Sequence, residues 1–324
     1  MNTEKTTYKG ITLPDGFAPT KIDGEDSFDD GLVITDGYGN EYVWVEVPRT
    51  TTVYPTAGLN ITSFTNDEYT EIENDLHTYT ADYRNGTSYS DVYYEDSTPG
   101  WFADSLAYDT AKKKMLKSVY ENGGFWVGRY EVGTEKNRTS SRQATTTPLS
   151  KANLYPYNYI TRTQAKVLAE QVESGSYTSS LMFGVQWDLV LKYLEIKGTS
   201  QADLITNSTS WGNYQNNAWN ITNENLKYVP NGSGWTSATE KTKDSSTSIL
   251  LSTGASDDFS KQGIYDLAGN VWEWTLEKTS NSSYPCAIRG GSYRNDGGRY
   301  PAANRNCDVT THCSYYVGFR VSLY

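Results

Sequence analysis

From Thr199 to the C-terminus, this 324-residue chain shows no apolar spacing that predicts a helix. The stretch is rich in Asn, Ser, Trp and Gly, and its apolar runs are long enough only for short strands. Because buried backbone N–H and C=O groups need partners, loops of this extent must be ordered by their own hydrogen bonds. The sequence therefore predicts a loop-rich fold held by aromatic packing and side-chain-to-backbone bonds.

Helical spacing is found only before that stretch. The segment 65–79 begins with a capping threonine, and the segment 115–124 ends in a Gly-Gly stop; both place apolar residues on one face. The segment 161–169 opens with the capping box Thr-x-x-Gln, and the segment 187–198 ends in Lys-Gly. We therefore expect four amphipathic helices.

Strand signals lie mainly in the first half of the chain. Residues 41–47 (EYVWVEV) alternate with a period of two, which is typical of a half-buried strand, and residues 125–132 predict another strand. Residues 1 to about 60 are rich in Gly, Asp and Thr with short apolar alternation, which indicates a β-rich opening. Residues 80–104 predict a long polar connection between the first two helices.

The charge and the absence of long apolar runs exclude several classes of partner. The net charge is −11 at pH 7, so the chain offers no basic stripe to nucleic acid or to anionic lipid. The first ten residues have no apolar core of a signal peptide, and no run approaches the roughly 18 apolar residues of a spanning helix. We expect cytoplasmic synthesis without direct membrane insertion, and any place on a virion or a cell surface to be reached through a partner.

Cysteine and histidine are too scarce for several kinds of site. The three cysteines are an odd number without metal-ligand spacing, so a disulfide framework is not expected. The two histidines, His77 and His312, are too few for a His-rich metal site. They also leave little scope for a Ser-His-Asp triad.

Three short blocks in the C-terminal half have residues suited to joining loops: 263–275 (GIYDLAGNVWEWT), 289–293 (RGGSY) and 318–321 (GFRV). Their glycines suit positive φ or close backbone approach. Trp272 and Trp274 alternate onto one face of a strand, and Arg289 and Arg320 could tie loops through bidentate bonds to carboxylates or carbonyls.

These ordered blocks resemble the three signatures of the formylglycine-generating enzyme/sulfatase-modifying factor family. The resemblance implies an α+β, C-type-lectin-like fold of the formylglycine-generating-enzyme type, with two helices around small twisted sheets and much of the chain in loops. It covers residues 116–324. Residues 1–115 then form an N-terminal extension of short strands and one or two helices, of the kind seen in gut-bacterial and phage members, which could be integrated with the main domain.

The resemblance also implies a structural calcium ion. Backbone oxygens near Gly269 and Val271 and the side chain of Glu273 would hold it, because Ca²⁺ prefers oxygen ligands. The alternative is that this block is only a staple of the core. No other cofactor is expected.

The residues that the family's oxidases need are replaced here. Those enzymes use two cysteines, five residues apart, just after the Arg-Gly-Gly-Ser block, because copper(I) and thiol chemistry need thiolates. The matching positions are Asn295 and Tyr300. Cys307 and Cys313 lie later and six apart, and Cys286 precedes the block. We therefore expect no enzymatic activity; a family enzyme with an atypical site remains the alternative.

The region 290–318 has an unusual composition. It contains no Lys, Glu, Gln, Met or Trp, although these five types make up about one residue in six of the chain. They are the types that an asparagine codon cannot reach when its two adenines are randomised and its third base stays a pyrimidine. The region is similar to the variable region of a diversity-generating-retroelement protein. An ordinary family member with a polar loop, or a purely structural lectin-like module, is the alternative.

The composition of this region suits binding. Tyr, Ser, Asn, Gly, Arg and Asp are the residues of antibody paratopes, which combine rigid aromatic area with adaptable hydrogen bonds. The resemblance implies a protein or glycan ligand on a target cell or phage surface. The candidate ligand-binding residues are Arg294, Asn295, Asp296, Gly298, Arg299, Tyr300, Cys307, Asp308, Val309, His312, Cys313, Ser314, Tyr315 and Tyr316.

These fourteen side chains should be mostly solvent-exposed around a shallow depression, where the family's enzymes keep their active site. Their backbone should be ordered without helix or strand, because Arg289, Arg320 and the Trp272/Trp274 platform would hold both ends of the segment.

Overall fold

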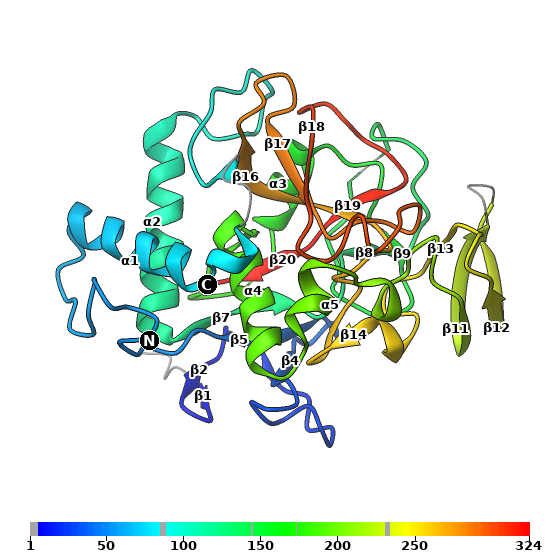
Figure 1. Cartoon of the computed structure of the whole chain (residues 1–324), viewed down its shortest axis with the longest axis horizontal. Helices are drawn as coiled ribbons and strands as arrows, with labels where there is room; N and C mark the ends of the chain where they lie inside the picture. Colours follow the sequence, from blue (N-terminus) through cyan, green and yellow to red (C-terminus); the bar gives the residue numbers. More distant parts are fainter. Residues whose placement is uncertain (1–5, 85–88, 144, 173, 231–233) are drawn as a thin grey trace.

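An antiparallel six-stranded sheet lies at the centre of the molecule (Figure 1). The computed structural model describes residues 6–84, 89–143, 145–172, 174–230 and 234–324. The strand order is β10 (Ser179–Leu181), β20 (Val321–Leu323), β7 (Gly124–Gly128), β5 (Glu41–Glu46), β4 (Val33–Thr35) and β3 (Ala18–Pro19). Strands from both ends of the chain therefore share one sheet, and one hydrophobic cluster extends from Ile11 to Tyr324.

The four predicted helices are confirmed, with the predicted caps. They are α1 (Asn66–Tyr79), α2 (Ser105–Asn122), α3 (Arg162–Ala169) and α4 (Gly184–Ile196). Thr65 and Thr161 form capping boxes with Glu68 and Gln164. Helix α2 ends at Gly123, whose φ of 73° is the left-handed cap that glycine adopts without strain.

Two strand predictions need correction. Strand β5 is present, but Tyr42, Val43, Trp44 and Val45 are all buried, so the strand is not half-buried. It lies inside the sheet between β4 and β7, with α4 packed against it. Because successive side chains of a strand point to opposite faces, the burial of all four shows that both faces are covered. The strand predicted over residues 125–132 ends early, because β7 covers only Gly124–Gly128.

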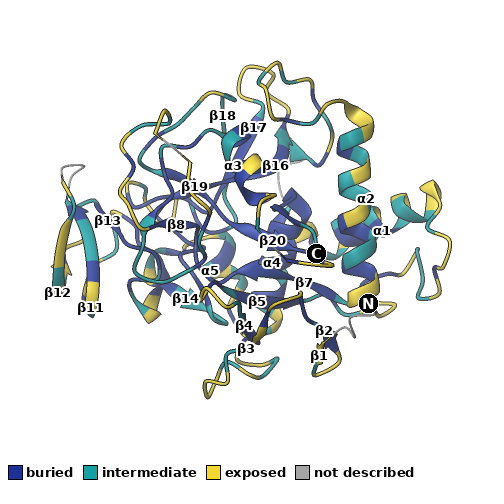
Figure 2. Ribbon diagram, turned by 180° about the vertical axis from the view of Figure 1, so that it is seen from behind, coloured by how far each residue is buried: buried dark blue, intermediate teal, exposed yellow. Residues whose placement is uncertain are grey.

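The part after Thr199 is more regular than its sequence predicts. A short helix, α5 (Gln201–Ile205), is capped by Ser200, so the prediction of no helix there is wrong. A three-stranded sheet pairs the long strands β11 (Trp219–Pro230) and β12 (Thr236–Lys243), with β13 (Ile249–Leu251) beside β11. Figure 1 shows this sheet at one end of the molecule, and Figure 2 shows exposed residues along β12.

A second sheet carries the three sequence blocks. Its order is β18 (Arg305–Asp308), β17 (Cys286–Arg289), β16 (Trp272–Thr279) and β19 (Val317–Phe319), and β6 (Tyr89–Ser90) also pairs with β16. Glu273 of β16 is in register with Arg289 on one side and Gly318 on the other. The chain thus leaves β17 after Arg289, pairs with β17 again through β18, and returns beside β16 at Val317, so the intervening segment has fixed ends.

The remaining elements are short. They are β1 (Thr7–Tyr8), β2 (Ile11–Thr12), β8 (Gly133–Thr134), β9 (Tyr155–Pro156), β14 (Ser260–Lys261), β15 (Ile264–Tyr265) and the 3₁₀ turns η1 (Ala81–Tyr83), η2 (Thr209–Trp211) and η3 (Asp257–Phe259). Within the described ranges, no helix has the length and apolar character to cross a membrane.

Candidate ligand-binding site

Arg289 fixes the start of the segment 290–316. Its buried guanidinium donates to Asp188 Oδ1 at 2.8 Å and to Glu277 Oε2 at 3.1 Å. The same side chain donates to the carbonyls of Ala303 and Asn304, within the segment itself. The prediction that Arg289 ties loops through carboxylates and carbonyls is confirmed.

Arg320 fixes the returning end of the segment and pairs with Glu273, one of the residues expected to bind calcium. Its Nη2 and Nε donate to Glu273 Oε1 at 2.7 and 3.2 Å, and Nε donates to Glu273 Oε2 at 3.1 Å. Its other donors reach the carbonyls of Gly128 and Tyr265. Both carboxylate oxygens of Glu273 therefore accept from Arg320, which disfavours this side chain as a ligand in the calcium site expected at Gly269, Val271 and Glu273.

Two glycines allow the chain to turn directly after Arg289. Gly290 and Gly291 have φ of 89° and 80°, and a Cβ on them would lie 2.7 Å from Leu267 O and 2.6 Å from Tyr300 O. Any other residue would meet backbone strain and a clash here. Trp272 and Trp274 are buried beside this turn, and Trp274 Nε1 donates to Ile160 O at 2.9 Å.

The fourteen candidate residues are less exposed than predicted. Arg294, Asp296, Gly298 and Arg299 are exposed, and Ser314 is buried with 8% of its surface accessible. The other nine are half-buried: Asn295, Tyr300, Cys307, Asp308, Val309, His312, Cys313, Tyr315 and Tyr316. The expectation of a mostly exposed set is not met, because most of these side chains also contact the scaffold.

The backbone of the segment is held by strand pairing and by side-chain caps. Cys307 and Asp308 lie in β18, paired with β17, so the expectation of a segment without strands is wrong. Asp296 Oδ1 accepts from the N–H groups of Gly298 and Arg299 and closes an exposed turn. Asn295 Oδ1 accepts from Ser292 N at 3.0 Å and Ser292 Oγ at 2.7 Å, so this side chain supports the turn.

A shallow depression of about 330 Å³ lies over the second sheet. We call it the polar hollow; it is lined by Trp272, Ile288, Ser292, Arg294, Asn295, Asn306, Cys307, Asp308 and Tyr316. Five of the fourteen candidates line it. Sequence reasoning missed the other four, of which Asn306 lies within the segment and Trp272 in the first block.

Tyr315 and Tyr316 separate the polar hollow from a second, smaller one. Their rings meet edge to face with centroids 5.3 Å apart. Tyr316 lines the polar hollow, whereas Tyr315 lines the smaller hollow. Arg294 connects the two sides, because it lines the polar hollow and its Nη1 donates to the hydroxyl of Tyr315. These three side chains form a ridge between the hollows.

The remaining candidates surround this ridge without lining the polar hollow. Tyr300 packs edge to face on Trp272 at 5.7 Å, and the guanidinium of Arg299 lies 5.4 Å from the Tyr300 ring. The His312 ring lies 5.8 Å from that of Tyr316, and its Nδ1 is 3.4 Å from Asp308 Oδ1. Tyr159 N donates to the carbonyl of Ser314. Val309 and Cys313 lie in the same loop.

Thiol chemistry is disfavoured in the polar hollow. Partial burial and, secondarily, the Asp308 carboxylate raise the pKa of the Cys307 thiol. A raised pKa reduces the thiolate fraction that acts as nucleophile or soft-metal ligand. Across the described residues, no group of three or more His, Cys, Asp or Glu side chains is arranged to hold a metal ion.

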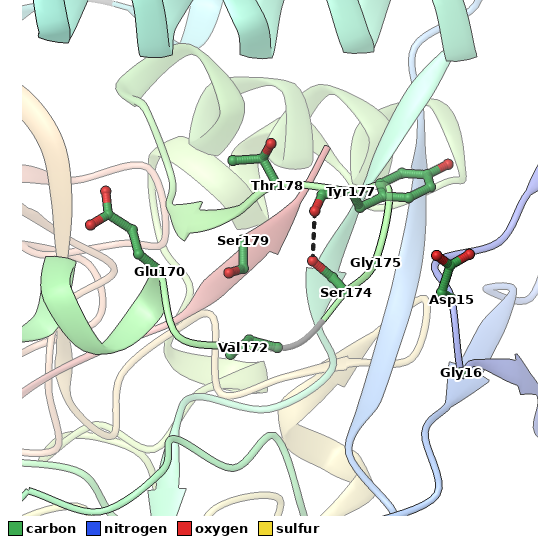
Figure 3. Close-up of a pocket in the computed structure, with 9 residues that line it drawn as sticks. All are labelled: Asp15, Gly16, Glu170, Val172, Ser174, Gly175, Tyr177, Thr178 and Ser179. Carbon is green, nitrogen blue, oxygen red and sulfur yellow. Dashed lines mark hydrogen bonds between the residues drawn. The ribbon is translucent and has the colours of Figure 1, made fainter.

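A larger hollow lies elsewhere and contains none of the fourteen candidates. Figure 3 shows it beside α3, with the carboxylates of Asp15 and Glu170 at its two ends. It measures about 790 Å³ and is wide open. Ser174 Oγ donates to Tyr177 O at 2.8 Å, so this hydroxyl already has a partner. Sequence motifs give no reason to assign a function to it.

Comparison with known proteins places the chain in a family. Among solved structures, CarF aligns with a TM-score of 0.36 and 13% identity over 61% of this chain and 85% of that one. Variable protein 1 of Treponema denticola aligns with a TM-score of 0.27 and 14% identity over 87% of this chain and 84% of that one. No curated protein matches the sequence. The family model of the sulfatase-modifying factor enzyme 1-like domain matches residues 105–323. Since that match spans well over half of the sequence, the chain belongs to the sulfatase-modifying factor enzyme 1-like family, whose α+β, C-type-lectin-like and loop-rich fold it has.

Proposed function

We propose that this chain is a non-catalytic binding protein whose ligand rests on the ridge of Arg294, Tyr315 and Tyr316 and on the polar hollow beside it. One observation supports this most: an exposed arginine and two half-buried tyrosines stand together between two hollows. Arg and Tyr are enriched among the residues that dominate binding energy, and they act best where neighbours exclude water.

A scaffold that fixes the backbone supports the same proposal. The segment begins at Arg289 and ends before Arg320, and both guanidinium groups are buried among carboxylates and carbonyls. Ordering a loop on binding costs free energy, so a segment already held at both ends loses less. Side chains can then change while the backbone that presents them stays the same, as diversification by a retroelement would require.

The absence of catalysis follows from the side chains at the two cysteine positions. Asn295 holds Ser292, and Tyr300 packs on Trp272, so neither supplies a thiolate. Cys307 is the one thiol among the residues that line the polar hollow, and its raised pKa disfavours the reactive form. A single thiol also cannot form the disulfide that a cysteine pair would.

We assign the ligand to the surface of a target cell or phage, as a protein or a glycan. The test uses the labelled full-length protein on intact bacterial cells, phage particles and a glycan array. The variant Arg294→Ala/Tyr315→Ala/Tyr316→Ala removes the ridge, and the control Tyr38→Ala/Leu106→Ala/Tyr284→Ala removes three exposed side chains elsewhere. Binding should fall at least about tenfold in the ridge variant and stay unchanged in the control, since each lost hot-spot residue costs more than about 1 kcal/mol. Equal binding by both variants would refute the proposal.

The enzyme alternative has its own test. Copper-loaded protein is incubated with a Cys-x-Pro-x-Arg peptide, and the product is read by mass spectrometry. We expect no conversion of the cysteine to formylglycine. Turnover that disappears in Cys307→Ser would show that the polar hollow is an atypical active site.

A further inference from the structure

The smaller hollow beside Tyr315 has four aromatic side chains among its lining residues, and most of the lining comes from outside the region 290–318. We call it the aromatic hollow; its walls include Tyr159, Trp235, Tyr293 and Tyr315, and its base includes Val229 and Leu250. Tyr159 precedes α3, and Trp235 lies just before β12, so distant parts of the chain converge here. Only Tyr315 comes from the fourteen candidate residues.

Contacts within the protein fix these walls. Trp235 Nε1 donates to Asn137 Oδ1 at 2.8 Å, and its ring meets Tyr155 edge to face at 4.9 Å. The Tyr315 ring lies 6.2 Å from that of Tyr159 and 6.5 Å from that of Tyr293. Aromatic walls held in this way lose little conformational entropy when a ligand enters.

The base of the hollow is a separate apolar cluster. Val229, Leu250 and Tyr293 pack with Val271, apart from the main core, and Trp235 and Tyr315 are partly buried against them. The base is therefore apolar, and a ligand group that covers it removes apolar surface from water, which is favourable by about 25 cal/mol per Å².

The size and the polar groups of the hollow select its occupant. Its volume is about 110 Å³. A cavity of roughly 150 Å³ lined by apolar side chains encloses a whole benzene molecule, so this smaller hollow has room for at most one aromatic ring. Among its polar residues, Asn137 already accepts from Trp235, and Asn158 Nδ2 donates to Tyr315 O at 2.9 Å. Arg138 donates to the carbonyls of Asn158 and Tyr159, whereas Asn158 Oδ1 accepts no hydrogen bond from the described residues. A sugar ring needs several hydrogen bonds at once, whereas an aromatic side chain needs none or one.

We infer that the aromatic hollow receives one aromatic side chain, of phenylalanine or tyrosine size, from a polypeptide ligand. This inference rests on the proposed function and refines it: the ligand is a protein, and its aromatic residue enters beside the ridge. Trp235, Tyr159 and Tyr293 supply attraction that is common to different ligands. The side chains of the ridge and the polar hollow then choose among those ligands.

The test uses p-cresol, which is the tyrosine side chain without its backbone, and methyl α-mannopyranoside as the sugar probe. Saturation-transfer NMR on the full-length protein reports which probe binds. Trp235→Ala removes one wall, and Thr139→Trp fills the mouth from an exposed position while leaving every wall in place. Tyr38→Ala is the matched control, because it removes a distant exposed tyrosine.

We expect p-cresol to bind the wild type and Tyr38→Ala equally, and its binding to fall about tenfold in both hollow variants, since losing a central aromatic contact costs more than about 1 kcal/mol. The sugar should not bind in the aromatic hollow. Undetectable p-cresol binding, p-cresol binding that both variants retain, or sugar binding that both variants abolish would overturn the inference.

The same variants separate this inference from the proposed function. If cells or phage bind the wild type through the ridge but bind Trp235→Ala equally well, the inference fails and the proposed function stands. If p-cresol binding depends on Trp235 while no surface ligand depends on the ridge, the hollow is real and the proposed function fails.

Discussion

The segment 294–316 and the three sequence blocks both contribute strands to the sheet of β18, β17, β16 and β19, yet their side chains are buried to different extents. The blocks place Trp274, Arg289 and Arg320 in full burial, with the Arg289 guanidinium between two carboxylates and that of Arg320 against Glu273. The segment keeps its backbone in place with turns and one strand, and most of its side chains stay partly or fully exposed. We therefore expect stability to reside mainly in the blocks and the exposed positions of the segment to tolerate substitution.

Among these substitutions, Arg320→Ala should lower the free energy of unfolding most. It leaves the buried Glu273 carboxylate without its arginine, and such loss of one partner costs about 3–5 kcal/mol. Denaturant unfolding measures the change, and Arg294→Ala provides the matched arginine in the segment, with an expected change within about 0.5 kcal/mol. The double variant Arg320→Met/Glu273→Leu should recover much of the loss. If Arg320→Ala and Arg294→Ala lower the free energy of unfolding equally, the blocks are not more important for stability than the segment.

Trp274→Ala should have the next largest effect. It should lower the free energy of unfolding by at least about 3 kcal/mol, because it leaves a cavity and removes the hydrogen bond to Ile160 O. Trp272→Ala should cost a similar amount, because this side chain is also buried. Tyr316→Ala in the segment, half-buried at the ridge, should cost clearly less. The comparison fails if the tyrosine variant unfolds at the same denaturant concentration as either tryptophan variant.

Acid should act on the scaffold through His77. Burial, aided by Arg84 and Lys112, lowers the pKa of His77 from 6.5 to about 3, while Lys112 pairs with Glu73 at 3.0 Å. His77 stays neutral in the folded protein but is protonated in the unfolded chain. The free energy of unfolding should therefore fall as the pH drops below 6.5, by about 2 kcal/mol at pH 5. His77→Gln should lack this loss.

The measurement for His77 is the difference in unfolding free energy between the wild type and His77→Gln at pH 7 and pH 5, in which the titration of the carboxyl groups cancels. A difference that stays constant over this range would show that His77 is not held neutral.

The smallest expected differences in unfolding free energy are between residues within the segment. Asn295→Ala should cost about 1 kcal/mol, because Asn295 accepts two hydrogen bonds from Ser292, whereas Arg299→Ala should stay within about 0.5 kcal/mol. Ser314 is buried, so its substitution should also cost more than that of an exposed residue. Thermal unfolding that ranks Arg299→Ala as the more damaging change would contradict this assignment.

Local signals in the sequence predicted the elements that depend on local contacts. The capping boxes at Thr65 and Thr161 place α1 and α3 correctly, since the bonds lie within four residues. Helix α5 escaped prediction because it is five residues long with only Leu204 buried, and its carbonyl accepts from the distant Ala303 N. In β11 a register shift between Thr222 and Leu226 breaks the period of two and hides a long strand.

The sequence predicted which segment forms the site, but not which of its side chains lie on the surface. The blocks at its ends define it in sequence, and their arginines act as expected. The burial of Ser314 depends on tertiary contacts that no spacing reveals, and so do the bonds of Asn295. The aromatic hollow was missed for the same reason, because Tyr159 and Trp235 meet Tyr315 only in the folded chain.

Two displayed libraries would test the central claim most directly. One randomises Arg294, Asp296, Arg299, Tyr315 and Tyr316 in the segment, and the other randomises Trp272, Trp274, Arg289, Val317 and Arg320 in the scaffold. The fraction of members that resist proteolysis measures folding in each. We predict that most of the segment library folds and that almost none of the scaffold library does. Equal folded fractions in the two libraries would contradict the claim that a variable binding surface stands on a fixed scaffold.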